Sequence, residues 1–200
     1  MTQRDLWNER YRERGAVWGV GPNQFVAERM EGMTPRRVLD LGSGQGRNAI
    51  WMAQQGHRVT AVDISDVATG QGQEMAEKAG VGVEFIAADI GEWEPPHAAF
   101  DLVLLAYIQL PESSRCALHV KAMRALAPGG SVLVVAHHRD NLENGVGGPP
   151  LAEMLFTEDE LASDFAGLDI VENSRVLRHV DNGDVVGDAI DIVFIGEKLS

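Results

Sequence analysis

The sequence predicts an α/β fold of one domain, with a doubly wound and mostly parallel sheet. First, residues 38–48 (VLDLGSGQGRN) close an apolar run with an acid and then place a glycine at every second position. Second, apolar runs alternate with helix-like segments, which favours parallel strands joined by crossover helices. Third, Asn182-Gly183 separates the last two apolar runs, and Asn-Gly between strands is a hairpin signal.

Composition excludes several classes of protein. The 200 residues fit one domain, 1–200, with a sizeable core, and a net charge of -13 argues against a nucleic-acid or anionic-membrane partner. Cys116 is the only cysteine, so no internal disulfide forms and no cysteine-built metal site is expected. The polar start is no signal peptide, and no apolar run approaches the ~18 residues of a membrane span. We therefore expect a cytoplasmic protein without a membrane partner.

The first part of the chain has clear element boundaries. Residues 1–31 are expected to form an N-terminal cap of one or two short helices, broken at 19–22. Ser65 or Asp66 caps a helix that ends before Gly80. The run at 101–106 is almost wholly apolar, as suits a strand buried on both faces. We expect strands at 37–41, 58–63, 83–87, 101–106 and 131–137, and helices from about 46 to Gly56, 66–78 and 112–126.

The last part contains a long loop and a hairpin. Residues 139–156 are rich in glycine and proline, so regular structure is improbable there and a lid over the substrate is expected. Thr157 and Glu160 match a capping box that opens a short helix. Strands at about 169–178 and 189–197 should be antiparallel neighbours.

The glycine run differs from a dinucleotide fingerprint. It reads GxGxG, and Arg47 stands where GxGxxG has its third glycine. Asp40 directly precedes the loop, where a carboxylate repels a diphosphate but suits a cationic amino-acid group. Asp63 closes the next strand, near the position expected for a ribose-binding acid. S-adenosylmethionine has a ribose diol, an ammonium and a sulfonium but no phosphate, so the two acids favour it over a dinucleotide.

The run from Leu39 to Asn48 resembles the class I S-adenosylmethionine-dependent methyltransferases. It looks most like the tellurite-resistance and thiopurine methyltransferase-like group, in which Gly-Arg-Asn follows the loop. The resemblance extends from about Trp18 to Lys198. It implies a Rossmann-like sheet of seven strands with an antiparallel C-terminal hairpin. Ser43 departs from the Cys or Ala usual in the family.

The resemblance also implies roles for single residues. Asp40 would order the loop and face the methionine ammonium, and Asp63 would bind the ribose hydroxyls. Asp89 would accept from the adenine amino group. Backbone approach to the cofactor would occur at Gly42, Gly44 and Gly46. Further cofactor-binding positions are Trp18, Ser43, Arg47, Asn48, Ile64, Ile90 and Tyr107, of which Trp18 and Tyr107 have ordinary packing as the alternative.

Two histidines follow the strand at 131–137. Neighbouring strand residues face opposite sides, so only one of His137 and His138 can face the substrate cleft as a base or orienter. We favour His138, which lies farther beyond the strand and nearer the lid. The alternative is a solvated strand end without a catalytic role. No metal site is expected, for want of well-spaced ligands.

These features predict an enzyme that transfers a methyl group to a small-molecule acceptor and releases S-adenosylhomocysteine. A soft sulfur or metalloid nucleophile is among the acceptors considered. Two alternatives remain: a nicotinamide-dependent reductase, and a non-catalytic S-adenosylmethionine-binding module. The sequence identifies neither the acceptor nor the oligomeric state.

Overall fold

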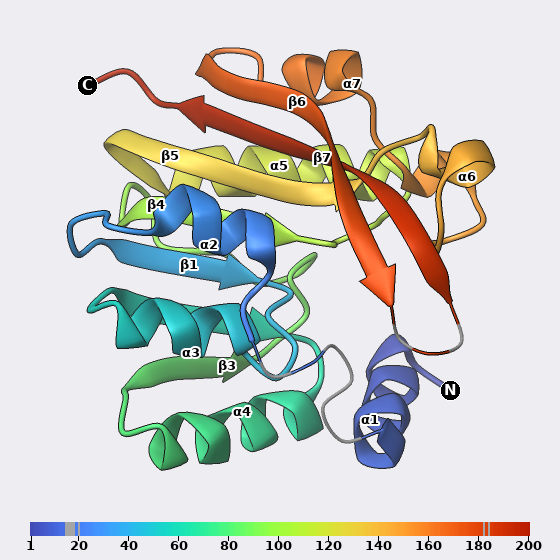
Figure 1. Ribbon diagram of the computed structural model, residues 1–200. Coiled ribbons are helices and arrows are strands. Elements are labelled where there is room, and N and C mark those ends of the chain that lie inside the picture. Colours follow the sequence, from blue (N-terminus) through green and yellow to red (C-terminus); the bar gives the residue numbers. More distant parts are fainter. Residues whose placement is uncertain (15–18, 20, 182, 184) are drawn as a thin grey trace.

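A computed structural model describes residues 1–14, 19, 21–181, 183 and 185–200, and places one seven-stranded sheet between helices (Figure 1). The strand order is β3-β2-β1-β4-β5-β7-β6. The strands are β1 (Arg37–Leu41), β2 (Arg58–Asp63), β3 (Val83–Ala87), β4 (Phe100–Ala106), β5 (Leu126–His137), β6 (Asp169–Asp181) and β7 (Val186–Glu197). The helices are α1 (Gln3–Arg14), α2 (Gln24–Met30), α3 (Arg47–Gln54), α4 (Asp66–Lys78), α5 (Glu112–Ala125), α6 (Asn141–Asn144) and α7 (Glu158–Asp164), with a 3₁₀ turn at Ala152–Met154.

The sheet confirms the predicted fold class. Strands β3, β2, β1, β4 and β5 run parallel, whereas β7 is antiparallel to both of its neighbours, β5 and β6. The bounds of β1, β2 and β3 agree with the sequence prediction because each strand is an apolar run closed by turn residues. The C-terminal hairpin is confirmed as well, although both of its strands are longer than expected. Residues 182 and 184 of its turn lie outside the described residues.

Two parts of the chain differ from the prediction, namely the start of β5 and segment 139–156. Strand β5 begins at Leu126 rather than at residue 131, because the backbone of Gly129 and Gly130 pairs with Lys198 and the register with β4 shifts there. Segment 139–156 is not wholly irregular. It contains α6 and the 3₁₀ turn, and the Asn141 side chain accepts from the backbone N–H of Ile190 on β7 at 2.7 Å.

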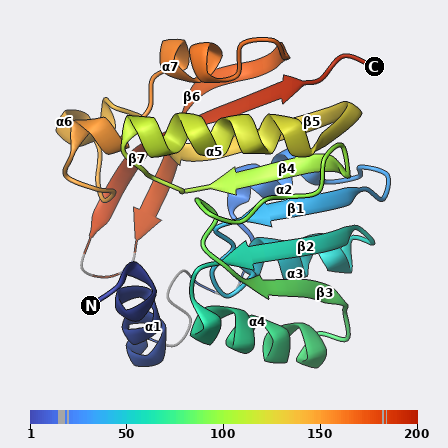
Figure 2. The same cartoon turned by 180° about the vertical axis from the view of Figure 1, so that it is seen from behind.

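Helices cover both faces of the sheet, so the core has two halves. Helices α2, α3 and α4 cover one face, and α5 and α7 cover the other (Figures 1 and 2). On the second face Phe165 stacks between His119 and Phe194, with ring centroids 4.4 and 5.0 Å away. None of the helices in the described part of the chain is long and apolar enough to cross a membrane.

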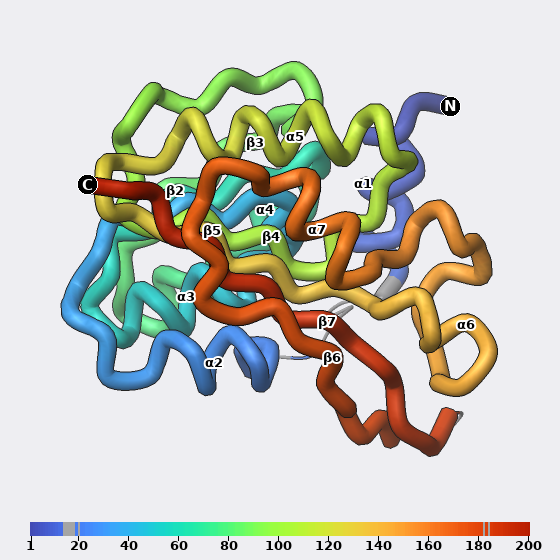
Figure 3. Tube along the Cα trace, turned by 90° about the horizontal axis from the view of Figure 1, so that it is seen from above, coloured from blue at the N-terminus to red at the C-terminus, as the bar shows by residue number. Residues whose placement is uncertain are grey.

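The carboxyl edge of the parallel strands is flanked by three separate segments. Helix α1, the α6 region and the far end of the β6–β7 hairpin all lie at this edge (Figures 1 and 3). In open α/β sheets, ligands bind outside the carboxyl ends of the strands. The fold therefore brings the first, middle and last parts of the chain to the place where a ligand is expected.

Two glycines of α4 give a test of this packing. A Cβ at Gly72 would lie 2.7 Å from Cε1 of Phe85 and 2.8 Å from the carbonyl oxygen of Gln45, whereas a Cβ at Gly70 would meet nothing within 4 Å. We predict that Gly72→Ala lowers the free energy of unfolding by about 1–3 kcal/mol through overpacking. Gly70→Ala, the matched control in the same helix, should raise it by up to about 1 kcal/mol through helix propensity. Urea unfolding followed by circular dichroism measures both, and equal effects would contradict the packing.

Candidate functional site

The glycine loop between β1 and α3 is a tight left-handed turn. Gly42, Gly44 and Gly46 have φ angles of 64°, 56° and 76°, which residues with a side chain rarely adopt. The space beside the first two is also small. A Cβ at Gly42 would lie 2.9 Å from Cγ1 of Ile108, and a Cβ at Gly44 would lie 2.6 Å from the Tyr11 hydroxyl. Both conformation and space therefore require glycine here.

Gly46 has a different neighbour from the one that the resemblance implies. A Cβ at this position would lie 2.6 Å from Cζ of Phe85, the same ring that packs against Gly72. The space that this glycine leaves is thus occupied by the protein's own core. Gly46 lets β3 and α3 approach each other closely.

Asp63 at the end of β2 holds the loop in place. One of its carboxylate oxygens accepts from the backbone N–H of Gly44 at 2.8 Å, and the other accepts from that of Ser65 at 2.9 Å. Burial raises the pKa of Asp63, while these two hydrogen bonds lower it in part. Each oxygen keeps a further lone pair, so the carboxylate can also accept from a ligand hydroxyl.

Asp40 at the end of β1 is a buried acid with an unpaired oxygen. Its side chain is 1% exposed, and Oδ2 has no hydrogen-bond partner among the described residues. Burial and the charge of Asp63 raise the pKa of Asp40 to about 8, although Arg47 opposes the shift. In the same part of the chain, the Ser43 hydroxyl of the loop is also buried without a partner. Unpaired buried polar atoms are costly, so these two residues fit a ligand that brings a cationic donor such as an ammonium.

The other residues that the resemblance assigns to the adenosine are Asp89, Ile90, Ile64 and Trp18. Asp89 is exposed, and its Oδ1 accepts from the backbone N–H of Gly91 at 2.8 Å. Ile90 and Ile64 are half-buried, and Ile90 approaches the Cβ position of Gly42 to within 3.9 Å. Trp18 lies outside the described residues.

Helix α1 contributes residues that the sequence analysis missed as site residues. The Asn8 amide donates to Asp66 at 2.8 Å, and its oxygen accepts from the Ser65 hydroxyl at 2.7 Å. One turn later Tyr11 is buried against Gly44. In the sequence, Trp7 and Tyr11 are compatible both with a packed helix and with a cover over the cofactor. No local signal connects Asn8 with a cap in the next βα unit.

A second cluster surrounds Tyr107 at the end of β4. Tyr107 has a φ of 56°, unusual for a residue with a side chain, and its hydroxyl donates to Asp191 at 2.6 Å. Nε of Arg178 donates to the same carboxylate oxygen at 2.7 Å. The Asn23 amide donates to the Tyr107 hydroxyl at 3.3 Å. Strands β4, β6 and β7 and the start of α2 thus meet in one polar network.

The two histidines lie on opposite sides of the sheet, as strand alternation predicts. His137 joins the Tyr107 cluster: its Nδ1 lies 2.9 Å from Oδ1 of Asp191, and its ring centroid lies 5.1 Å from that of Tyr107. His138 faces α7, where its Nε2 lies 3.0 Å from Glu158 and its Nδ1 accepts from the backbone N–H of Asp140. Both ring nitrogens of His138, the residue that we favour for the substrate cleft, thus have partners on the α7 side of the sheet. Which histidine faces the substrate stays a prediction.

Arg47 and Asn48 at the start of α3 lie between the two clusters. Asn48 accepts from the backbone N–H of Asn23 at 2.8 Å. Arg47 interacts electrostatically with Asp40 on one side and with Tyr107 on the other, and burial is the main cause of its lowered pKa. The glycine loop and the Tyr107 cluster are thus neighbouring parts of one site.

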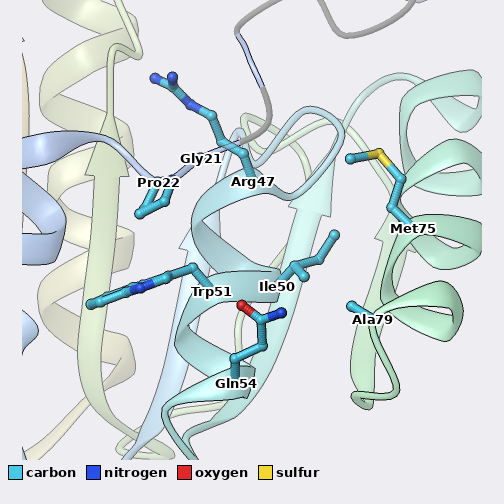
Figure 4. A pocket seen from close by; sticks show the side chains of 8 residues that line it. All are labelled: Gly21, Pro22, Arg47, Ile50, Trp51, Gln54, Met75 and Ala79. Atoms are coloured by element: carbon cyan, nitrogen blue, oxygen red, sulfur yellow. The ribbon is translucent and has the colours of Figure 1, made fainter.

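A groove of about 300 Å³ lies on the outer side of α3, and Figure 4 shows its lining. Its residues are Gly21, Pro22, Arg47, Ile50, Trp51, Gln54, Met75 and Ala79. Neither Asp40 nor Asp63 belongs to it, so this groove is not the ligand cleft. No group of three or more metal-ligating side chains occurs among the residues that the structure describes.

The chain matches the family model described as a methyltransferase domain over residues 38–130. It is 25% identical over 170 residues to the 2-heptyl-1-hydroxyquinolin-4(1H)-one methyltransferase of Mycobacteroides abscessus, covering 82% of this chain and 74% of that protein. It is 31% identical over 123 residues to the ubiquinone biosynthesis O-methyltransferase of Escherichia coli, covering 58% of this chain and 49% of that protein. The chain thus spans about half the length of the second relative.

Solved structures share the fold. A protein of echinomycin biosynthesis superposes with a TM-score of 0.78 at 20% identity, covering 99% of this chain and 92% of that one. TehB from Haemophilus influenzae superposes with a TM-score of 0.73 at 19% identity, covering 98% of this chain and 66% of that one. A third structure is the 1,6-didemethyltoxoflavin-N1-methyltransferase of Burkholderia thailandensis, solved with S-adenosylhomocysteine. It superposes with a TM-score of 0.66 at 22% identity, covering 98% of this chain and 84% of that one.

The raised pKa of Asp40 predicts a pH-dependent stability. An acid whose pKa is higher in the folded than in the unfolded chain binds more protons when folded, so its contribution to stability falls as pH rises from about 4 to about 8. We predict that Asp40→Asn stabilises the ligand-free protein at about pH 8, and that the gain shrinks towards about pH 4. Thermal unfolding at several pH values measures the difference from wild type.

Asp101 provides a control of opposite sign. Hydrogen bonding to Arg37 lowers the pKa of this carboxyl, so the stability it contributes is lost as pH falls through its folded pKa. Asp101→Asn should therefore be slightly destabilising near neutral pH and neutral in acid. An Asp40 variant that behaves like the Asp101 variant would contradict the buried, unpaired state of Asp40.

Proposed function

We propose that the chain is a class I S-adenosylmethionine-dependent methyltransferase, and that it transfers the cofactor's methyl group to a small molecule bound at the carboxyl edge of the sheet. The observation that carries this proposal is the buried, unpaired carboxyl of Asp40, directly before a left-handed glycine loop that Asp63 holds. An acidic protein with a single cysteine suits a cytoplasmic enzyme with a small-molecule substrate and no nucleic-acid partner.

We assign the ends of the cofactor as follows. Asp40 and Ser43 face the amino-acid group, where an ammonium would supply the missing donor. Asp63 accepts from the ribose hydroxyls through its remaining lone pairs. Asp89 accepts from the adenine amino group through the oxygen that does not bind Gly91. Ile64 and Ile90 contribute contacts to the adenosine, and Arg47, Asn48 and Tyr107 line the side towards the acceptor.

Methyl transfer makes modest demands on the protein. The bound cofactor supplies an electrophilic methyl group on a positively charged sulfur. The chain must hold the acceptor in line with it and exclude water, and orientation of this kind is worth up to about 7–11 kcal/mol. The junction of Asn23, Asn48 and Tyr107 ties α2, α3 and β4 together beside the loop, and so supports a fixed distance between the two binding regions.

The alternatives make different predictions. A nicotinamide-dependent reductase would bring a diphosphate to the loop, next to Asp40, where repulsion disfavours it. A non-catalytic binding module would bind the cofactor without turnover. Release of S-adenosylhomocysteine with any of a panel of hydroxyl, amine, thiol and metalloid acceptors distinguishes an enzyme from such a module. The same panel tests the soft sulfur or metalloid acceptor that the sequence left open.

Two variants test the assignment of cofactor ends. We predict that Asp40→Asn weakens binding of S-adenosylhomocysteine at least tenfold but leaves 5′-methylthioadenosine unaffected, because the latter lacks the amino-acid group. Asp89→Ala should weaken both ligands to a similar degree. Isothermal titration calorimetry measures the four affinities. The wild-type affinity for S-adenosylhomocysteine should also rise between about pH 6 and 8, as Asp40 ionises.

Asp181→Ala, at the far end of the hairpin, is a suitable control for the loss of a surface carboxylate. Equal losses of both ligands in the Asp40 variant would place Asp40 beside the adenosine and contradict the assignment. Unchanged binding in the Asp89 variant would remove Asp89 from the site.

Segment 139–156 is proposed to cover the acceptor. Its Gly148 packs against the His137 ring, so that a Cβ there would lie 2.9 Å from Cδ2 of that ring. We predict that amide exchange in this segment slows when S-adenosylhomocysteine and an acceptor bind together. Hydrogen exchange with mass spectrometry measures the change, and equal exchange with and without both ligands would contradict a lid.

A further inference from the structure

Asp191 is a buried anion with three polar neighbours. Its side chain is fully buried on β7, and it lies within hydrogen-bond distance of His137, Tyr107 and Arg178. Burial raises its pKa, but hydrogen bonding to His137, Arg178 and Tyr107 outweighs that effect and holds the pKa below its ordinary value. Asp191 is therefore ionised near neutral pH and can act only as an acceptor.

An ionised Asp191 determines which nitrogen of His137 carries the proton. Nδ1 lies 2.9 Å from Oδ1 of Asp191 in an ion-pair contact whose angle is not that of a hydrogen bond, and neither atom has another partner among the described residues. A proton on Nδ1 would satisfy both buried atoms, so the carboxylate favours it there. Nε2 then keeps its lone pair. Among the described residues none forms a hydrogen bond with Nε2, and Gly148 leaves room beside it, since a Cβ there would come within 3.1 Å. This is the arrangement of a histidine held ready to take a proton.

His138 has the opposite arrangement and serves as an internal comparison. Its Nδ1 accepts from the backbone N–H of Asp140 at 3.0 Å, so the proton of the neutral ring lies on Nε2, directed to Glu158. The two neighbouring rings thus differ in tautomer. Of the two, only His137 keeps an unprotonated nitrogen without a partner among the described residues, beside Gly148 and in a ring that contacts Tyr107.

The cluster also lies where an acceptor must enter. Tyr107 shares the ring contact with His137 and is connected through Asn23 to Asn48, at the start of the helix that follows the glycine loop. The charged and titratable groups around His137 come from three strands or their ends: Tyr107 directly after β4 and Asp191 on β7 contact the ring, and Arg178 on β6 binds both of them. Arg178 donates through Nε to Asp191, so its cationic group lies beside the same space.

We propose that His137, oriented by Asp191, is the general base for an acceptor that carries a weakly acidic hydroxyl group. This inference rests on the proposed methyl transfer and specifies its acceptor class. Nε2 takes the hydroxyl proton as an oxygen lone pair forms the new bond to the methyl carbon. The carbon–sulfur bond breaks, and its electron pair stays on sulfur as a neutral thioether. The imidazolium beside Asp191 then releases its proton to solvent.

This chemistry distinguishes a hydroxyl acceptor from a soft one. A metalloid anion has a lone pair without losing a proton, so a base would contribute nothing to its methylation. A hydroxyl with a phenol-like pKa of about 10 is almost wholly protonated at neutral pH, and general base catalysis then contributes about 10²–10⁴-fold. Asp191 acts through His137 and is a positioning residue.

The first test needs no acceptor. In the complex with S-adenosylhomocysteine, ¹⁵N NMR of the imidazole rings should place the neutral proton of His137 on Nδ1 and that of His138 on Nε2. Asp191→Asn should remove the preference in His137 and leave His138 unchanged. A proton on Nε2 of His137 in the wild-type protein would overturn the proposal.

The second test compares acceptors. S-adenosylhomocysteine release is measured with phenols, catechols and N-hydroxy heteroaromatic compounds, and with thiols and selenite. We expect transfer to hydroxyl acceptors, a loss of about 10²–10⁴-fold in kcat for His137→Gln, and cofactor affinity within twofold of wild type. The loss should shrink for 4-nitrophenol, which is largely ionised near pH 8. Asp191→Asn should give a smaller loss with an altered pH profile, and circular dichroism checks that it folds.

His179→Gln is the matched control, because His179 forms an exposed pair with Asp188 at 3.1 Å away from the site. It should retain wild-type kcat. Transfer to thiols or selenite alone, or an unchanged kcat in His137→Gln, would overturn the base while leaving methyl transfer intact. Cofactor binding without transfer to any acceptor would instead contradict the proposed function, and the NMR result would then decide the tautomer separately.

Discussion

The carboxylate of Asp63 is the constraint on which the rest of the site depends. It accepts from the backbone of Gly44 in the glycine loop and from that of Ser65 at the cap of α4. The Ser65 hydroxyl in turn accepts from the backbone N–H of Ala68 and donates to Asn8 on α1. Because a buried backbone N–H without a partner is costly, these bonds determine the position of the loop relative to α1 and α4.

Two other buried carboxyls at the same edge have opposite properties. Asp40 has an oxygen without a partner, and burial raises its pKa, so the ligand-free protein holds a proton there. Asp191 has three polar neighbours: it accepts hydrogen bonds from Tyr107 and Arg178, and its Oδ1 lies 2.9 Å from Nδ1 of His137. These contacts keep its pKa below the ordinary value despite similar burial. The opposite directions of the two pKa shifts come from the neighbours of Asp40 and Asp191, because both side chains are buried. One acid is suited to a cationic ligand group, and the other is suited to a histidine that takes up a proton.

Most of the fold could be predicted from the sequence, but the composition of the site could not. The bounds of β1, β2 and β3 followed from apolar runs and glycine stops, and the hairpin followed from Asn-Gly. Asp191 gave no signal, because it lies inside the apolar run of β7, and its partner Tyr107 lies 84 residues earlier in the sequence. The extension of β5 to Leu126 was missed, because Pro-Gly-Gly predicts a turn wherever no partner strand is specified.

The sequence by itself determined the class of fold, the resemblance to a methyltransferase family and the glycine loop with its two acids, since these depend on local periodicity, on backbone angles that only glycine adopts readily, and on residues at set spacing. Only the tertiary structure decided the surroundings of the two histidines. Alternation sends His137 and His138 to opposite sides but does not say which side is which. That depends on Asp191 from β7 and Glu158 from α7, which reach the two rings through long-range pairing that no local pattern encodes.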